Sequence, residues 1–291
     1  RLCIVFDMDR TMVGNLASLS DRDNIETNAE WSWWPEGQHR GLSAEEIIPF
    51  LERGMVRPGL MALVEYLTEI GATMVVYTHS EHRWASKVCQ AMEKMAGINF
   101  IRKLFSRQDC KDGHPEFAAR KSLHFVAEQL NQDPSLAWVH VQNMILFDDD
   151  GTALGAGEET QLVRVPSYDY WEACKWDEVI TPELLQKQND PDLVERVRRS
   201  VVEWAYAPPS YGKEGELCEE DQKADAAWAE KWEKRLEMAN SYNKLAVLDR
   251  VWKNVKDTLG KIEEFDEAEM AALPDRLRRA AGTAARPARR R

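Results

Sequence analysis

The sequence is poor in cysteine, with 5 cysteines in a chain of 291 residues and no Cys-x-x-Cys pair or Cys/His cluster among them. Disulfide frameworks use an even set of cysteines at short spacing, and structural zinc sites use paired Cys or His ligands. Neither pattern is present, so we expect a fold that depends on neither. The predicted location is an intracellular, reducing compartment, either the nucleus or the cytoplasm.

Long apolar segments are also absent from the sequence. A transmembrane helix needs about 18 or more consecutive apolar residues. The longest apolar runs here, residues 72–77 and 144–147, have the length of buried strands. The pattern therefore predicts no membrane span. With 44% hydrophobic residues, the chain still has enough apolar side chains for a substantial core.

Positive charge is scarce, because 38 Lys and Arg stand against 50 Asp and Glu and give a net charge of −12. Proteins bind a phosphate backbone through Lys and Arg, so nucleic acid is not an expected partner. One segment reverses the balance: residues 276–291 contain seven arginines and no acidic residue. We predict a disordered basic tail there. It either has no partner, carries a nuclear targeting signal or binds an acidic partner.

Apolar runs and helical periodicity alternate along the first 180 residues or so. Continuous apolar runs that end at polar residues are typical of buried parallel strands, and the amphipathic segments between them predict helices. Strands are predicted at residues 2–6, 73–77, 99–104, 144–147 and 162–165, and helices at residues 60–70, 81–95 and 118–130. This order predicts an α/β fold, a three-layer sandwich with a central parallel sheet between two layers of helices.

We assign this sheet domain to residues 1–181, with two additions. Residues 14–56 form a polar, Trp-rich insertion that we interpret as a small cap, with one short helix signal at Ser43. Residues 182–275 show helical periodicity and predict a helical C-terminal region, a possible contact surface for a protein partner. Three tryptophans are expected to anchor that region on the sheet domain: Trp228, Trp232 and Trp252.

Two carboxylates follow the first predicted strand. Asp7 and Asp9 stand two residues apart in the sequence Phe-Asp-Met-Asp-Arg-Thr. At this spacing, Asp7 can attack a phosphorus atom while Asp9 reaches the leaving oxygen and protonates it. The same loop can bring the Asp7 carboxylate and the Asp9 backbone carbonyl to one hard cation. The alternative interpretation is an ordinary surface turn.

Two later strands end in side chains that suit the same chemistry. The strand at residues 73–77 runs into Thr78, whose hydroxyl can hydrogen-bond a phosphoryl oxygen. The strand at residues 144–147 runs into three acids, Asp148, Asp149 and Asp150, which repel one another unless a cation lies between them. The sequence therefore predicts a metal site at the end of this strand.

These motifs together resemble those of the haloacid dehalogenase (HAD) superfamily, in the order Asp-x-Asp-x-Thr, strand-Thr, Lys and strand-Asp-Asp. Further motifs resemble those of the polymerase C-terminal-domain and NLI-interacting-factor-like (Dullard-like) protein phosphatases. The resemblance covers about residues 2–180 and is carried by Arg57-Pro58-Gly59-Leu60, Val76-Tyr77-Thr78-His79-Ser80, Trp84-Ala85, Arg107-Gln108-Asp109-Cys110, Arg120-Lys121-Ser122-Leu123 and Tyr168-Asp169-Tyr170-Trp171.

The resemblance implies a role for each motif residue. The nucleophile is Asp7, and the general acid and base is Asp9. The implied Mg²⁺ ligands are Asp7, Asp9 through its backbone carbonyl, Asp149 and Asp148. The implied phosphate-binding residues are Thr11, Thr78, Ser80 and Lys121, of which Thr78 and Lys121 are also catalytic.

Two lysines compete for the catalytic position. Lys121 stands where the family has Lys-Asp-Leu, although Ser122 replaces the Asp, as Arg10 replaces the usual Glu near the nucleophile. Lys121 is predicted to open a helix that packs on the sheet, which would hold its ammonium rigidly. Lys111 lies in a predicted polar loop and is the alternative.

The predicted activity is phosphomonoester hydrolysis through an aspartyl-phosphate, with Mg²⁺ as cofactor. Because no large cap follows Thr78 to enclose a small molecule, the predicted substrate is a phosphoserine or phosphothreonine in a protein. One alternative is a small-molecule or nucleic-acid-end phosphatase that uses the same residues. The other is a non-catalytic scaffold that keeps the fold.

Overall fold

The computed structural model describes residues 1–14, 16, 20, 41–113, 120–168 and 249–282. The chain divides into two compact units, the first made of Arg1–Asn15, Ala44–Tyr170 and Leu245–Arg291, the second of Leu16–Ser43 and Trp171–Lys244. Nearly all described residues belong to the first unit. Within the described ranges, no helix has the length and apolar character needed to cross a membrane.

Five parallel strands form the centre of the first unit, in the order β3-β2-β1-β4-β5. They are β1 (Cys3–Phe6), β2 (Thr73–Tyr77), β3 (Ile101–Phe105), β4 (Met144–Asp148) and β5 (Leu162–Arg164). Every residue of β1 and β4 is buried, as expected for parallel strands covered on both faces. The predicted parallel sheet is confirmed, and the strand bounds differ from the predicted ones by at most two residues.

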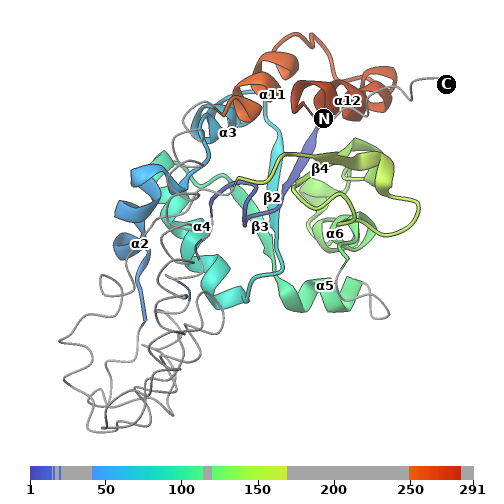
Figure 1. Cartoon of the computed structure of the whole chain (residues 1–291). Coiled ribbons are helices and arrows are strands. Elements are labelled where there is room, and N and C mark those ends of the chain that lie inside the picture. The colour runs from blue at the N-terminus through green and yellow to red at the C-terminus, as the bar shows by residue number, and fades with distance from the viewer. Residues whose placement is uncertain (15, 17–19, 21–40, 114–119, 169–248, 283–291) are drawn as a thin grey trace, which may run out of the picture. The chain divides into compact units, whose positions relative to one another are not determined.

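Helices cover both faces of this sheet, so the predicted three-layer arrangement is confirmed. Figure 1 shows α3 and α4 on one side of the strands, with α11 beside α3, and α6 on the other side. The described helices are α2 (Ala44–Phe50), α3 (Leu60–Glu69), α4 (His82–Ala96), α5 (Arg107–Gly113), α6 (Leu123–Leu130), α11 (Val251–Leu259) and α12 (Glu267–Ala280). Short helical turns are η2 (Leu51–Met55), η3 (Pro134–Leu136), η4 (Val141–Asn143) and η5 (Glu159–Gln161).

The two faces of the sheet have different apolar partners. On one face, Cys3 and Val5 of β1 belong to a buried cluster that includes Leu123 and Val126 of α6. On the other face, Phe6 packs against Trp252 of α11. Since side chains alternate across a strand, neighbouring residues of β1 serve opposite helix layers.

Local residue chemistry sets the helix ends next to the strands. Gly59 adopts a φ of 83° directly before α3, and Gly97 adopts a φ of 69° directly after α4. These left-handed conformations cost glycine little. Ser122 caps α6, because its hydroxyl accepts a hydrogen bond from the amide of Phe125 at 3.2 Å. The short helix signalled at Ser43 is present as α2, which begins at Ala44.

Two predictions about the lysines are corrected. The helix predicted at residues 118–130 begins at Leu123, so Lys121 does not open it and instead pairs with Leu154 in a short β-bridge. Lys111 lies in α5 rather than in a loop. The segment around Lys111 is polar and lacks the apolar periodicity that predicts a helix. Before Leu123 the predicted helical pattern extends beyond the true start of α6.

The C-terminal assignments are partly corrected. The basic tail was predicted to be disordered from Arg276, but α12 continues through Ala280, and the Arg278 side chain donates a hydrogen bond to the Leu162 carbonyl of β5 at 2.9 Å. Trp252 anchors α11 on the sheet, as predicted. Residues 169–248 and 283–291, with Trp228 and Trp232, lie outside the described residues, as does most of the 14–56 insertion.

Candidate active site

The carboxyl ends of β1, β2 and β4 bring the predicted acidic and hydroxyl residues to one edge of the sheet. β1 lies between β2 and β4. Asp7 follows β1 directly, and its amide donates a hydrogen bond to the Phe147 carbonyl of β4 at 2.9 Å. Thr78 follows β2, and Asp148 is the last residue of β4. The strand order alone therefore gathers residues from three distant parts of the chain.

Lys121 joins two of these carboxylates. Its Nζ donates a hydrogen bond to Asp7 Oδ1 at 2.6 Å and another to Asp148 Oδ2 at 2.7 Å. The side chain is only 1% exposed, so water screens these ion pairs little. Its backbone is fixed to the loop after β4, since its amide donates to the Ala153 carbonyl at 2.7 Å and its carbonyl accepts from the Gly155 amide at 3.3 Å.

The same contacts decide which lysine the fold brings to Asp7. Lys121 reaches it with a buried ammonium held at both backbone and side chain. Lys111 is exposed on α5. The rigid mounting expected for a catalytic ammonium is therefore found at Lys121, although a β-bridge rather than a helix provides it.

The acidic cluster carries more negative charge than Lys121 can balance. Burial alone would lower the pKa of Lys121, but the Asp7 and Asp148 carboxylates outweigh it and raise that pKa, so the ammonium stays charged. Burial raises the pKa of Asp7 well above its usual range; Lys121 opposes this rise and Asp148 adds to it. Burial and the Asp148 carboxylate also raise the pKa of Asp149. A cation among these acids would reverse the repulsion.

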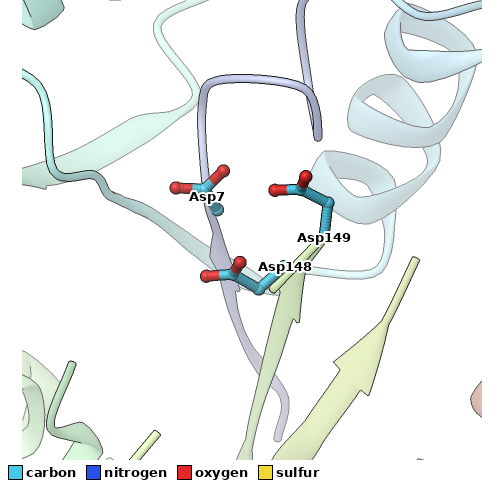
Figure 2. A group of neighbouring side chains, drawn as sticks. All are labelled: Asp7, Asp148 and Asp149. Carbon is cyan, nitrogen blue, oxygen red and sulfur yellow. The ribbon is translucent and has the colours of Figure 1, made fainter. Parts of the chain in front are cut away.

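Three carboxylates are placed to hold such a cation. Ligand oxygens of Asp7, Asp148 and Asp149 all lie within 4.8 Å of one another. Figure 2 shows them gathered at the strand ends, with Asp7 and Asp149 facing each other. The Thr11 hydroxyl accepts a hydrogen bond from the Asp149 amide at 3.1 Å, which ties the two acid-bearing loops together. Hard divalent cations prefer carboxylate oxygens, so this donor set fits Mg²⁺.

Asp9 faces a different set of partners. Its Oδ2 accepts a hydrogen bond from Ser80 Oγ at 2.7 Å and a longer one from Thr78 Oγ1 at 3.3 Å. Thr78 Oγ1 in turn accepts from the Ser80 amide at 3.1 Å. Burial raises the pKa of Asp9, and the two hydroxyls oppose this rise. A carboxyl with a raised pKa can hold a proton and later release it, as a general acid and base must.

The hydroxyls of Thr11 and Ser80 each contact an acidic residue of the site, and their phosphate-binding role stays a prediction. Thr11 is fully buried and its hydroxyl accepts a hydrogen bond from the Asp149 amide, whereas the Ser80 hydroxyl donates to the Asp9 carboxylate. Both contacts position acidic residues. A motif in the sequence does not indicate which way a hydroxyl points, because that depends on the neighbouring strand ends.

Glu158 is a site-supporting residue that the sequence patterns did not identify. This buried side chain accepts hydrogen bonds from the Leu123 amide at 3.0 Å and from the His124 amide at 2.8 Å, at the start of α6. It therefore fixes the helix end two residues after Lys121. Glu158 lies 35 residues from Leu123 in a polar loop with no periodicity, so no local signal could have identified it.

Two structures of one phosphatase are among the solved structures that match the chain. A variant of the fission yeast RNA polymerase II CTD phosphatase Fcp1 bound to beryllium fluoride is 14% identical over 83% of this chain and 66% of that chain, with a TM-score of 0.36. A structure of Fcp1, described as an essential RNA polymerase II CTD phosphatase, is 16% identical with the same coverage and a TM-score of 0.34. The chain thus spans just under two thirds of these structures. No curated protein matches it significantly.

A family comparison gives the assignment. The family described as NLI interacting factor-like phosphatase matches residues 2–187. This range holds all five strands and every site residue described above, and it ends before α11 and α12. Since the match covers more than half of the 291 residues, the chain belongs to the family of NLI interacting factor-like phosphatases, within the HAD superfamily.

Proposed function

We propose that this enzyme hydrolyses phosphomonoesters with Mg²⁺ through an aspartyl-phosphate on Asp7, and that it acts on phosphoserine or phosphothreonine in a protein. One observation carries the proposal: Asp7 is paired with the Lys121 ammonium, while Asp9 accepts hydrogen bonds from the Thr78 and Ser80 hydroxyls. An ionised carboxylate is a nucleophile, and a protonated one is an acid.

In the first step, a carboxylate oxygen of Asp7 attacks the phosphorus atom. The bond from phosphorus to the leaving oxygen breaks, and Asp9 transfers its proton to that oxygen. The products are the free alcohol and an acyl phosphate on Asp7. The Lys121 ammonium, hydrogen-bonded to Asp7 at 2.6 Å, offsets the repulsion between the carboxylate and the approaching phosphoryl anion.

In the second step, Asp9 acts as the base. Its carboxylate takes a proton from a water molecule, and the water oxygen attacks the phosphorus atom. The bond from phosphorus to Asp7 breaks, which releases inorganic phosphate and restores the Asp7 carboxylate. Asp9 ends the cycle protonated, as it began, so the protons balance.

The residues present fit a magnesium ion. Asp7, Asp148 and Asp149 would hold it, together with the Asp9 backbone carbonyl predicted from the sequence. When bound, the ion would offset the negative charge of the phosphoryl group and of the three carboxylates. Asp148 also binds Lys121, so one carboxylate would link the cation to the ammonium.

The substrate class follows from the space after Thr78. α4 begins at His82, four residues later, which leaves no room for a domain that closes over a small molecule at this point. The absence of such a domain between Thr78 and α4 suits a substrate residue carried on a protein surface. A phosphoprotein substrate is therefore favoured over a phosphometabolite.

Metal dependence can be tested with p-nitrophenyl phosphate as substrate. We expect EDTA to abolish turnover and added Mg²⁺ to restore it, because without the metal the Lys121 ammonium alone offsets the charge of three clustered carboxylates. Asp149→Asn should need a higher Mg²⁺ concentration for half-maximal rate and recover part of the activity at high Mg²⁺. Turnover that is indifferent to EDTA would contradict the metal proposal.

The substrate class can be tested with a panel of phosphoserine and phosphothreonine peptides, phosphometabolites and end-phosphorylated oligonucleotides. Release of inorganic phosphate is measured at equal enzyme concentration, and kcat/KM is compared. We expect the highest values on peptides. A clear preference for metabolites or oligonucleotides would instead support the corresponding alternative, with the same catalytic residues.

A further inference from the structure

Helix α11 lies outside the family match, which ends at residue 187, yet it belongs to the same compact unit as the sheet. The described part of the chain resumes at Asp249, and α11 packs against α3. The contact is close, since a Cβ atom on Gly59 would lie 3.3 Å from the Lys253 backbone nitrogen. The family resemblance therefore does not account for α11.

Trp252 of α11 packs against the residues directly before two site carboxylates. Its fully buried ring lies edge-on to Phe6, with centroids 5.6 Å apart, and to Phe147, with centroids 5.2 Å apart. Phe6 and Phe147 face each other across β1 and β4, with stacked rings 5.7 Å apart. Asp7 and Asp148 follow these two phenylalanines, so one indole supports the ends of both strands.

A partly buried ion pair fixes the start of the same helix. The Arg57 guanidinium donates hydrogen bonds from Nη2 and Nε to Asp249 Oδ2, at 2.8 Å and 3.2 Å. It also lies over the Trp252 ring, 5.7 Å from its centroid. Asp249 Oδ1 accepts from the Val251 amide at 3.0 Å, in the first turn of α11.

Arg57 also reaches the nucleophile loop. Its backbone amide donates a hydrogen bond to the Met12 carbonyl at 3.0 Å, and the preceding Val56 pairs with Val13. The loop that carries Asp7 and Asp9 is thus connected through Arg57 to α11. Trp252 supports the strand ends, and Arg57 supports the loop that follows.

We propose that Trp252 is a positioning residue for the phosphatase reaction. It holds the ends of β1 and β4 so that Asp7 and Asp148 keep their separation around Lys121 and the metal site, and the Asp249–Arg57 pair holds α11 in place for this task. The inference rests on the proposed function of Asp7 and Asp148. A displacement of about 1 Å in a reacting group can cost roughly a hundredfold in rate, so packing behind the site has a measurable effect.

The test uses the full chain with Trp252→Leu, Trp252→Phe and a matched control, Leu259→Ala. Leu259 is a fully buried residue of the same helix, about two turns away. For each protein we would measure the thermal midpoint, kcat and KM with p-nitrophenyl phosphate below all midpoints, and Mg²⁺ affinity by calorimetry without substrate. Trp252→Ala removes more of the ring contact and is measured as well if it folds. If it does not fold, Trp252→Leu decides the outcome.

We expect Trp252→Leu to lower kcat about tenfold or more and to weaken Mg²⁺ binding, and Trp252→Phe to restore most of both by keeping a ring edge against the two phenylalanines. Leu259→Ala should lower the thermal midpoint and leave kcat of the folded protein unchanged. Equal kcat and Mg²⁺ affinity in Trp252→Leu and the wild type would overturn the inference. The Asp7→Asn variant is measured in parallel to separate the positioning role of Trp252 from the proposed function. Retained activity in Asp7→Asn would mean that the proposed mechanism itself has failed.

Discussion

The two carboxylates of the Asp-x-Asp motif lie in different surroundings, although they are two residues apart. Asp7 binds the Lys121 ammonium, whereas Asp9 binds the hydroxyls of Thr78 and Ser80. Burial raises the pKa of both. An ammonium, and a cation among the neighbouring acids, favour only the ionised form of Asp7, while a hydroxyl can bond to either form of Asp9. In the proposed mechanism, the neighbouring strand ends therefore make Asp7 the nucleophile and Asp9 the acid.

The largest expected effect is on the Asp7 side of this comparison. Asp7→Asn keeps the side-chain volume and removes the nucleophile, so turnover should fall by several orders of magnitude with the fold intact. Initial rates with p-nitrophenyl phosphate and circular dichroism give the two readouts. Retention of more than about a hundredth of the wild-type rate would contradict the assignment of Asp7 as the nucleophile.

A smaller effect, of a different kind, is expected at Asp9. Asp9→Asn should lower turnover of a phosphopeptide by about 10²- to 10⁴-fold, because an alkoxide leaving group needs a proton. With p-nitrophenyl phosphate the leaving group needs little help, so the first step should persist and the phosphoenzyme should accumulate. Rapid mixing would show a burst of p-nitrophenol, and intact-protein mass spectrometry would show the added phosphate. Equal losses on both substrates, with no burst, would remove the proposed distinction between the two carboxylates.

The next largest effect is expected at Lys121, the ion-pair partner of Asp7. Lys121→Ala should reduce the rate about a hundredfold, the scale of removing one preorganised stabilising group. Lys111→Ala is the matched control and should stay within a few fold, because Lys111 is exposed on α5. Steady-state rates of the two variants decide the question. The reverse order would make Lys111 the functional lysine, despite the contact between Lys121 and Asp7.

The smallest expected effect concerns the partner of Asp9. The Ser80 hydroxyl lowers the pKa of Asp9 against the effect of burial, so Ser80→Ala should raise that pKa further. Since Asp9 must be protonated to act as the acid, the alkaline limb of the rate profile should move to higher pH, with a few-fold change in rate at the optimum. Ser86→Ala on α4 is the control. An alkaline limb that moves to lower pH, or an equal shift in the control, would contradict this role of Ser80.

The sequence was informative wherever a signal was local. Apolar runs located all five strands, and the acids and hydroxyls directly after β1, β2 and β4 identified the residues that gather at the site. Prediction was weaker in the polar segments around Lys111 and Lys121, where a helix was missed and another was started too early. Local patterns report burial along one element and carry no information about distant partners.

The sequence by itself thus determined the parallel sheet and singled out Asp7 and Asp9 as candidate site residues, because both inferences depend on residues adjacent in the chain. Only the tertiary structure decided that Lys121 pairs with Asp7, that Glu158 fixes the start of α6 and that Trp252 lies behind Phe6 and Phe147. These contacts join residues far apart in the sequence. The packing of whole strands and helices sets them, and no local pattern encodes which surfaces will meet.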